Sequence, residues 1–106
     1  MKQGDIVLVS FPFTNLKGSK RRPAVILYVD KLDVLAAFIT SKIIRPTSLE
    51  LRIDPSKYNQ LKKTSVIKAT KICTLEKVLI KGKLGSLTTL EKQELLAIYR
   101  MIFQFD

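Results

Sequence analysis

The apolar residues of this chain fall mostly into short runs that are rich in β-branched residues and bounded by turn formers. Such runs are typical of β-strands, and an apolar pattern with helical spacing occurs only near the C-terminus. About five to seven short strands with one terminal helix favour a mainly β fold, a small and strongly bent barrel. A chain of 106 residues that is 46% apolar can fill one core but hardly two. We therefore expect a single domain over residues 1–106.

The second and third expected strands form a hairpin. Strands are expected at residues 5–10, 23–30, 34–40, 49–53 and 64–70, the last leading into another around 71–75. The turn at residues 31–33 is short, so the two strands that it connects are expected to run antiparallel. Residues 54–58 indicate a single helical turn. After a short apolar patch at residues 78–80, Gly82 and Gly85 predict breaks.

The C-terminal segment has the spacing of an amphipathic helix. Thr88 followed by Glu91 predicts a capping box at its beginning. One face then carries Leu95, Ile98, Tyr99 and Ile102. Three further residues widen this apolar stripe: Leu96, Met101 and Phe103. The wide stripe indicates either deep packing on the sheet or a dimer contact.

Two residue types that commonly carry chemistry are scarce. The chain has no His, which excludes His-based zinc sites and catalytic triads. Cys73 is the single cysteine, so we expect neither an intrachain disulfide nor a paired-cysteine metal site, and a reducing, cytoplasmic location is favoured. The apolar run at residues 6–9 is too short for a signal peptide or a membrane span. We expect no metal, no cofactor and no membrane contact.

The chain is strongly basic. It has 19 Lys and Arg against 9 Asp and Glu, a formal net charge of +10. This charge favours a polyanionic partner, either a nucleic acid or an acidic protein. Composition alone equally allows a basic surface that is merely solvated.

The hairpin predicts which polar residues meet at one rim of the sheet. Whether its loop holds two or three residues, Arg22 and Thr40 fall within a residue or two of direct opposition. Pro23 favours an extended Arg22 at the point where a strand emerges from a loop. Residues 18–22 add a glycine, a hydroxyl and cations, and residues 40–42 add hydroxyls and another cation. These groups suit a phosphate-binding surface, although charged strand ends beside a solvated loop have the same composition.

At this point the sequence resembles a known family. The motifs are residues 4–14 (GDIVLVSFPFT), 18–26 (GSKRRPAVI), 39–42 (ITSK), 65–67 (SVI), 71–77 (KICTLEK) and 83–85 (KLG). In order and spacing they look like the MazF/PemK-type toxins of bacterial toxin–antitoxin systems. The resemblance covers essentially the whole chain.

The resemblance implies both a fold and an activity. The fold is an SH3-like barrel of the MazF/PemK/CcdB type with a C-terminal helix, usually dimeric. The activity is metal-independent endoribonuclease cleavage of single-stranded RNA. The family's catalytic arginine falls on Arg22 and its catalytic threonine on Thr40. We expect RNA contacts from Ser19, Lys20, Arg21, Ser41, Lys42 and Lys71.

One departure from the family pattern concerns RNA binding. Some relatives carry an arginine at the position of Cys73, and Lys71 or Lys68 would have to replace that charge. The general base is not identified, because Asp5 and Glu76 are conceivable bases but more typical structural or surface charges. Phe11 and Phe13 are candidates for stacking bases, although aromatic residues beside a strand more often pack in the core.

Three functions remain after this reading. The leading one is a sequence-selective, cytoplasmic ribonuclease toxin that attacks through the 2′-hydroxyl, forms a homodimer and is neutralised by an acidic antitoxin. The alternatives are a gyrase-inhibiting toxin of similar fold and a non-catalytic RNA-binding barrel. The pairing of Arg22 with Thr40 favours the first.

Overall fold

The structure is a computed structural model that describes residues 1–11, 20–43 and 49–105. Its elements are β1 (Asp5–Phe11), β2 (Lys20–Val29), β3 (Asp33–Thr40), β4 (Glu50–Ile53), β5 (Ser65–Glu76), the 3-10 helix η1 (Lys77–Leu79), β6 (Ile80–Ser86) and α1 (Thr89–Ile102). The prediction of a mainly β fold with a C-terminal helix is confirmed. Among the described residues, no helix has the length and apolar character needed to cross a membrane.

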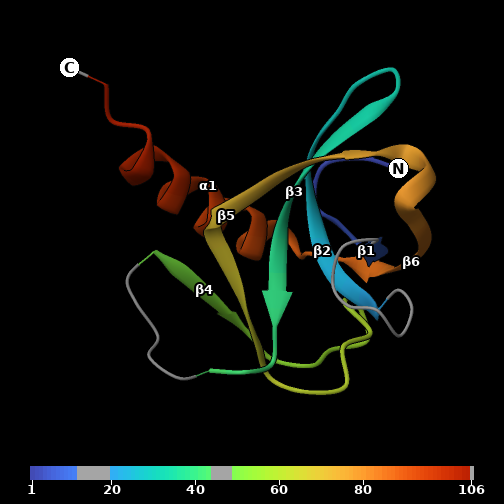
Figure 1. Ribbon diagram of the computed structural model, residues 1–106. Coiled ribbons are helices and arrows are strands. Elements are labelled where there is room, and N and C mark those ends of the chain that lie inside the picture. Colours follow the sequence, from blue (N-terminus) through green and yellow to red (C-terminus); the bar gives the residue numbers. More distant parts are fainter. Residues whose placement is uncertain (12–19, 44–48, 106) are drawn as a thin grey trace.

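The strands form one sheet in the order β4-β5-β3-β2-β1-β6, with antiparallel ladders between all neighbours (Figure 1). The sheet is strongly bent, as expected. Its order ends at β4 and β6, and no ladder joins these two strands in the described part of the chain. The SH3-like barrel therefore stays a prediction.

The β2–β3 hairpin has the shorter of the two expected loops. Its two loop residues are Lys31 and Leu32, because the Asp30 N–H donates a hydrogen bond of 2.9 Å to the Asp33 carbonyl. Beyond the loop the register does not stay constant. It changes by one residue between Ile26 and Tyr28, where β2 carries a bulge. Such a bulge bends a strand and redirects the side chains that follow it.

Strand β5 bends sharply in its middle, as Figure 1 shows. Phe38 lies opposite Lys68, whereas its neighbour Ala37 lies opposite Ile72, so residues 69–71 are extra on the β5 side. The sequence predicted a strand to residue 70 that leads into another. The structure has one continuous strand with an irregularity at that point.

Each face of the sheet carries its own cluster of buried residues. One cluster receives Val25 of β2 together with Leu95 and Ile98 of α1, which lies beside β4 and β5. The other receives Ala24 and Ile26, because successive side chains of a strand point to opposite faces.

Helix α1 begins as predicted, with the Thr88 hydroxyl accepting from the Glu91 N–H at 3.2 Å and the Glu91 carboxylate accepting from the Thr88 N–H at 2.8 Å. Leu95, Ile98, Tyr99 and Ile102 of the predicted stripe pack on the sheet, whereas Leu96, Met101 and Phe103 are exposed.

The glycines of β6 correct one expectation. Gly82 and Gly85 lie inside this strand and do not break it. At Gly85 the backbone passes so close to Tyr58 and Asn59 that a Cβ would collide with the Tyr58 carbonyl. The next residue, Ser86, donates its N–H to that same carbonyl at 2.8 Å. Gly85 is thus a close-approach residue that seats the turn at residues 56–60 against the strand.

That turn is the expected single helical turn, displaced by about two residues. The Gln60 N–H donates to the Ser56 carbonyl at 3.0 Å. Asn59 is fully buried, its side-chain oxygen accepts from Ser56 N and Leu61 N, and its amide donates to the Asp54 carbonyl. The buried amide therefore has partners and fixes the turn.

Candidate functional site

Arg22 and Thr40 lie on the same face at one end of the β2–β3 hairpin. The β2–β3 ladder pairs Ala24 with Phe38, and Arg22 and Thr40 are each two residues further along their strands. Residues two apart share a face. Each is also paired on its other side, Arg22 with Val9 of β1 and Thr40 with Val66 of β5. The neighbouring strands therefore fix the position of both backbones.

These two residues line one open pocket with a cavity volume of about 250 Å³. The pocket lies where β2, β3 and β5 meet. Its lining consists of Arg22, Phe38, Ile39, Thr40, Lys42, Lys68 and Lys71. The structure thus brings together four residues that the sequence predicted for the site and adds a lysine, Lys68, that the sequence left as an alternative.

The pocket is strongly cationic. Arg22, Lys42 and Lys71 are exposed, and no carboxylate belongs to the lining that the structure describes. The charge of Lys68 is partly balanced, because its Nζ lies 3.6 Å from a carboxylate oxygen of Glu50 on β4. Clustered charges of one sign in a concave site concentrate ligands of the opposite sign. The pocket is therefore suited to a phosphate-bearing ligand.

The Thr40 hydroxyl has a defined orientation. Its oxygen accepts a hydrogen bond of 3.1 Å from the Lys42 N–H, and the residue is half-buried. A hydroxyl that accepts in this way still has its own proton to donate. Thr40 can thus donate a hydrogen bond to an anion in the pocket, while the same contact holds Lys42 beside it.

Arg22 combines a fixed backbone with an exposed guanidinium. The following residue, Pro23, keeps Arg22 extended, as the sequence predicted, and lies opposite Leu8 of β1. The guanidinium presents donors in a rigid planar fork that matches two oxygens of one phosphate. At this position it can hold a phosphate between itself and the Thr40 hydroxyl.

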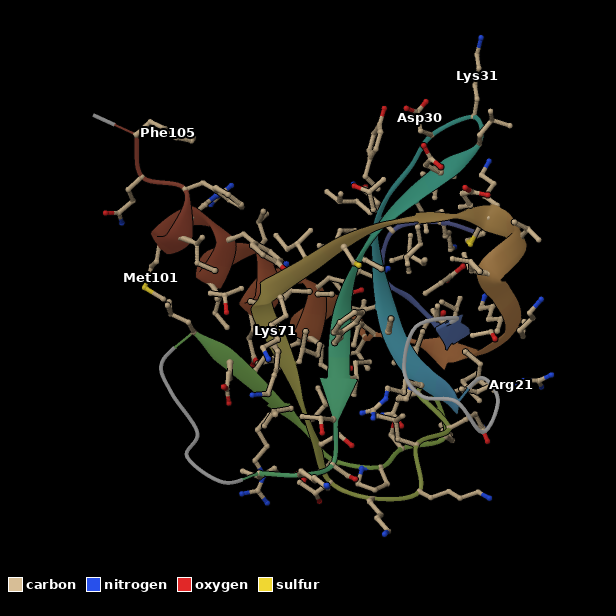
Figure 2. All side chains as sticks on the ribbon, viewed as in Figure 1. Arg21, Asp30, Lys31, Lys71, Met101 and Phe105 are labelled. Carbon is tan, nitrogen blue, oxygen red and sulfur yellow. The ribbon has the colours of Figure 1, made fainter. Side chains whose placement is uncertain are left out.

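Lys71 comes to the pocket through the irregularity of β5. It belongs to the extra residues 69–71, of which Ala69 is buried and Thr70 and Lys71 are exposed. Figure 2 shows Lys71 at the bend of β5 and Arg21 at the beginning of β2, on opposite sides of β3. No sequence pattern announced this bend, so the sequence named Lys71 only through the family resemblance.

The other predicted RNA-binding residues do not line the pocket. Arg21 and Ser41 are exposed, and strand alternation turns Arg21 to the face opposite Arg22. The backbone of Lys20, the first residue of β2, pairs with Phe11, but the side chains of these two residues are not described. Ser19 and Phe13 lie outside the described part of the chain altogether.

Neither carboxylate considered as a general base is near the pocket. Asp5 is buried between β1 and β6, where its oxygens accept from Lys2 N at 3.0 Å and Ser86 Oγ at 3.1 Å and lie 3.3 Å from Lys83 Nζ. Burial raises the pKa of Asp5, but these hydrogen bonds and the Lys83 charge outweigh it and hold the pKa below its usual value. Glu76 is exposed and pairs with Asp33 at the far end of β5. Both are structural or surface charges.

Cys73 does not line the pocket. Its side chain is half-buried, lies opposite Ala36 and packs against the cluster around Ile26. The cations of β5 are instead Lys68 and Lys71, and both line the pocket.

Phe38 was not among the residues that the sequence predicted for the site. It lies in the middle of β3, where a strand of apolar residues gives no indication that one side chain reaches a polar pocket. Only strand alternation could have indicated it, because Phe38 lies two residues before Thr40 and therefore on the same face of the strand.

Comparison with known proteins gives an independent result. Residues 2–104 match the family model described as the PemK-like, MazF-like toxin of type II toxin–antitoxin system. No significant match was found among curated proteins.

Solved structures share the fold at low sequence identity. An endoribonuclease in complex with its cognate antitoxin, from a mycobacterial species, has a TM-score of 0.79 and 18% identity, covering 100% of this chain and 99% of that chain. The toxin MazF-mt6 of Mycobacterium tuberculosis has a TM-score of 0.78 and 21% identity, covering 96% and 98%. The MazE–MazF structure of Deinococcus radiodurans has a TM-score of 0.75 and 16% identity, covering 100% and 97%. At such identities the likeness establishes the fold.

Proposed function

We propose that this chain, which belongs to the PemK-like, MazF-like toxins of type II toxin–antitoxin systems, is an endoribonuclease acting on single-stranded RNA. The observation that carries the proposal is the shared pocket of Arg22 and Thr40 among lysines. The mycobacterial structure that contains a cognate antitoxin is named an endoribonuclease, which supports the same activity here.

The proposed reaction is attack of a 2′-hydroxyl on the adjacent phosphorus. The new oxygen–phosphorus bond gives a 2′,3′-cyclic phosphate, and the bond to the 5′-oxygen of the next nucleotide breaks to leave a 5′-hydroxyl. Arg22 stabilises the negative charge that develops on the phosphate oxygens. Removing one such preorganised donor typically lowers the rate by about 10²- to 10³-fold.

Thr40 is proposed to orient the phosphate. Its hydroxyl is held by the Lys42 N–H and donates its proton to a phosphate oxygen. An unassisted hydroxyl is a poor proton acceptor, so the proton of the 2′-hydroxyl passes to water or to a substrate phosphate oxygen. The leaving 5′-oxygen takes a proton from water to become the 5′-hydroxyl. Lys42 and Lys71 hold neighbouring phosphates, which places the reacting groups in line.

The reaction is proposed to need no metal ion. The pocket's own cations supply the charge that a metal would otherwise bring to the phosphate. In the described part of the chain, no group of three or more His, Cys, Asp or Glu is arranged to hold a metal ion.

Incubation of the protein with a long RNA in the presence of a chelator tests the function. We expect discrete fragments with 5′-hydroxyl and 2′,3′-cyclic phosphate ends. Intact RNA that is nonetheless bound would favour a non-catalytic binder, and intact, unbound RNA with inhibited gyrase would favour the other alternative. Fragments with 5′-phosphates, or a strict need for magnesium, would contradict the proposed chemistry.

Variants of the pocket test the site. Arg22→Ala should lower turnover far more than RNA affinity, since the other cations maintain attraction, and Arg22→Lys should restore little, because an ammonium lacks the fork. Thr40→Val should also be folded and slow. Arg100→Ala is the matched control, because it removes the same charge from an exposed position on α1. Near-normal cleavage by all the pocket variants would show that the site lies elsewhere.

The protein is also proposed to form a homodimer. An apolar groove of about 370 Å³ lies between α1 and the sheet, with Leu96 and Phe103 on its wall although each is about half exposed. Met101 in the last turn of α1 and Phe105 beyond the helix are exposed as well (Figure 2). A second copy would cover these residues. Light scattering at micromolar concentration should give the mass of a dimer, and Leu96→Glu should give that of a monomer.

An acidic antitoxin is the proposed protein partner, as the named complexes of two structural relatives suggest. The charge of +10 would attract it over a long range. Salt should therefore slow association, and charge reversal at Lys20 and Arg21 should slow it further. Association rates that respond to neither change would contradict electrostatic attraction to this rim. The cytoplasm is the proposed location, since both RNA and antitoxin would be met there.

A further inference from the structure

Phe38 is the aromatic member of the cationic pocket. It lies on β3 between Ala24 of β2 and Lys68 of β5, and all three point to the same face because cross-strand partners do so. The ring is half-buried and lines the cavity together with Arg22 and Thr40. Its partner on β2, Ala24, has the smallest side chain that a strand residue can present beside it. Because Phe38 belongs to the lining of the pocket, part of the residue borders the cavity.

The surroundings of the ring match a general mode of binding single-stranded nucleic acids. Such sites combine cations that follow the phosphates with aromatic rings on which bases stack. Here the cations and the ring belong to one pocket, and Thr40, two residues along the same strand from Phe38, is the residue proposed to orient the phosphate. A base attached to a nucleotide held by Arg22 and Thr40 thus has an aromatic surface within the same cavity.

We propose that Phe38 is the platform on which a nucleobase next to the bound phosphate stacks. This inference rests on the proposed function in taking RNA as the ligand, and it goes beyond it by assigning the base contact. The ligand class is a single-stranded oligonucleotide with an unpaired base. Stacking is sequence-tolerant, so Phe38 provides affinity and places the base, while hydrogen bonds from elsewhere distinguish one base from another.

Phe38 also packs against the cluster around Ile26, so a loss of stability alone would not test the inference. The measured quantity must instead depend on the base. The comparison is between an RNA oligonucleotide and an abasic one of the same length and charge, both with 2′-O-methyl sugars that cannot be cleaved through the 2′-hydroxyl. Electrostatic attraction is the same for both, and the ratio of their affinities reports contacts to bases.

Phe38→Leu keeps an apolar side chain against the cluster and removes the aromatic face. We expect the preference for the base-bearing RNA to fall about 5- to 150-fold, the affinity that stacking of one base typically supplies. Phe38→Tyr should retain the preference. Leu79→Ala is the packing control, because Leu79 is half-buried against the same cluster and does not line the pocket. It should lower stability and leave the preference unchanged.

A second measurement uses the absence of Trp from the chain. Phe38→Trp introduces a single indole whose fluorescence reports stacking directly. We expect the base-bearing oligonucleotide to quench it and the abasic one to leave it nearly unchanged. A folded Phe38→Leu protein with the preference of the wild type, or equal quenching by both oligonucleotides, would overturn the inference.

These binding measurements separate the two proposals. If the protein cleaves RNA but its base preference does not depend on Phe38, the platform is wrong and the ribonuclease stands. If the preference depends on Phe38 and RNA is bound but never cleaved, the platform stands and the ribonuclease is wrong.

Discussion

Arg22 and Thr40 share a face of the sheet because a bulge in β2 shifts its pairing with β3 by one residue from the register at the hairpin loop. Next to the Lys31–Leu32 loop, Val29 pairs with Val34, and that register continued to the rim would place Arg22 opposite Ser41. The bulge between Ile26 and Tyr28 shifts the pairing, so Ala24 meets Phe38. Continued by two residues, the shifted register brings the guanidinium and the Thr40 hydroxyl to one cavity.

This relationship predicts that Arg22 and Thr40 act on the same phosphate. Arg22→Ala should lower kcat/KM by about 10²- to 10³-fold, and Thr40→Val should lower it by less, since a neutral donor is lost. Groups that hold one transition state are not additive, so the double variant should be only slightly slower than Arg22→Ala alone.

Single-turnover cleavage of one oligonucleotide by the four proteins measures this coupling. Loss of activity in the double variant equal to the product of the single losses would show that the two residues act independently.

The fold was predictable where the pattern is local. Hairpin, capping box and terminal helix follow from short-range signals, namely a short turn, Thr88 with Glu91, and an apolar stripe. β6 was missed because its glycines imply breaks, and only contact with the turn at residues 56–60 explains why Gly85 is required there. Contacts between segments that are distant in the sequence produce no periodic pattern in either segment.

The candidate site was predictable to the extent that it depends on the hairpin. Opposition of Arg22 and Thr40 follows approximately from the loop position, whereas the bulge that brings them to the same face does not. Phe38 and the bend of β5 at Lys71 depend on irregular pairing. Strand irregularities are set by packing on both faces, which a single sequence does not display.

Gly85→Ala should destabilise the protein. A Cβ at this position would collide with backbone atoms of Tyr58 and Asn59, which cannot rotate away as a side chain could. Such overpacking typically costs about 1–3 kcal/mol of unfolding free energy. Urea denaturation should show it as a lower midpoint.

Gly82→Ala is the control in the same strand. Nothing lies within 4 Å of a Cβ at Gly82, so the unfolding free energy should change by less than about 0.5 kcal/mol. Equal destabilisation by both substitutions would mean that strand β6, and not the contact with the turn, is sensitive to added side chains.

Tyr99 should make the protein lose stability at alkaline pH. Its hydroxyl is buried and has no hydrogen-bond partner among the described residues, and burial raises its pKa to about 12. A tyrosine in the unfolded chain ionises near pH 10, so the unfolded state gains charge first. The contribution of neutral Tyr99 to the free energy of unfolding is complete below pH 10 and is lost as the pH rises from about 10 to about 12.

Tyr99→Phe tests this assignment against the titration of all other groups. The variant should be at least as stable as the wild type at neutral pH, because an unpaired buried hydroxyl is removed. Its unfolding free energy should fall less steeply between pH 10 and pH 12. Parallel curves for the two proteins would show that Tyr99 ionises equally well in both states.

Glu50→Gln should strengthen RNA binding. Glu50 is the carboxylate that engages Lys68 at 3.6 Å, and it competes with any phosphate that approaches this lysine in the pocket. Without that charge, Lys68 is released to contact a phosphate. One additional contact to a single strand should steepen the slope of log K against log salt concentration by about 0.7. Glu94→Gln, the same change at an exposed position on α1, should leave the slope unaltered. Weaker binding by Glu50→Gln at every salt concentration would instead mean that the ion pair holds Lys68 in the position from which it contacts RNA.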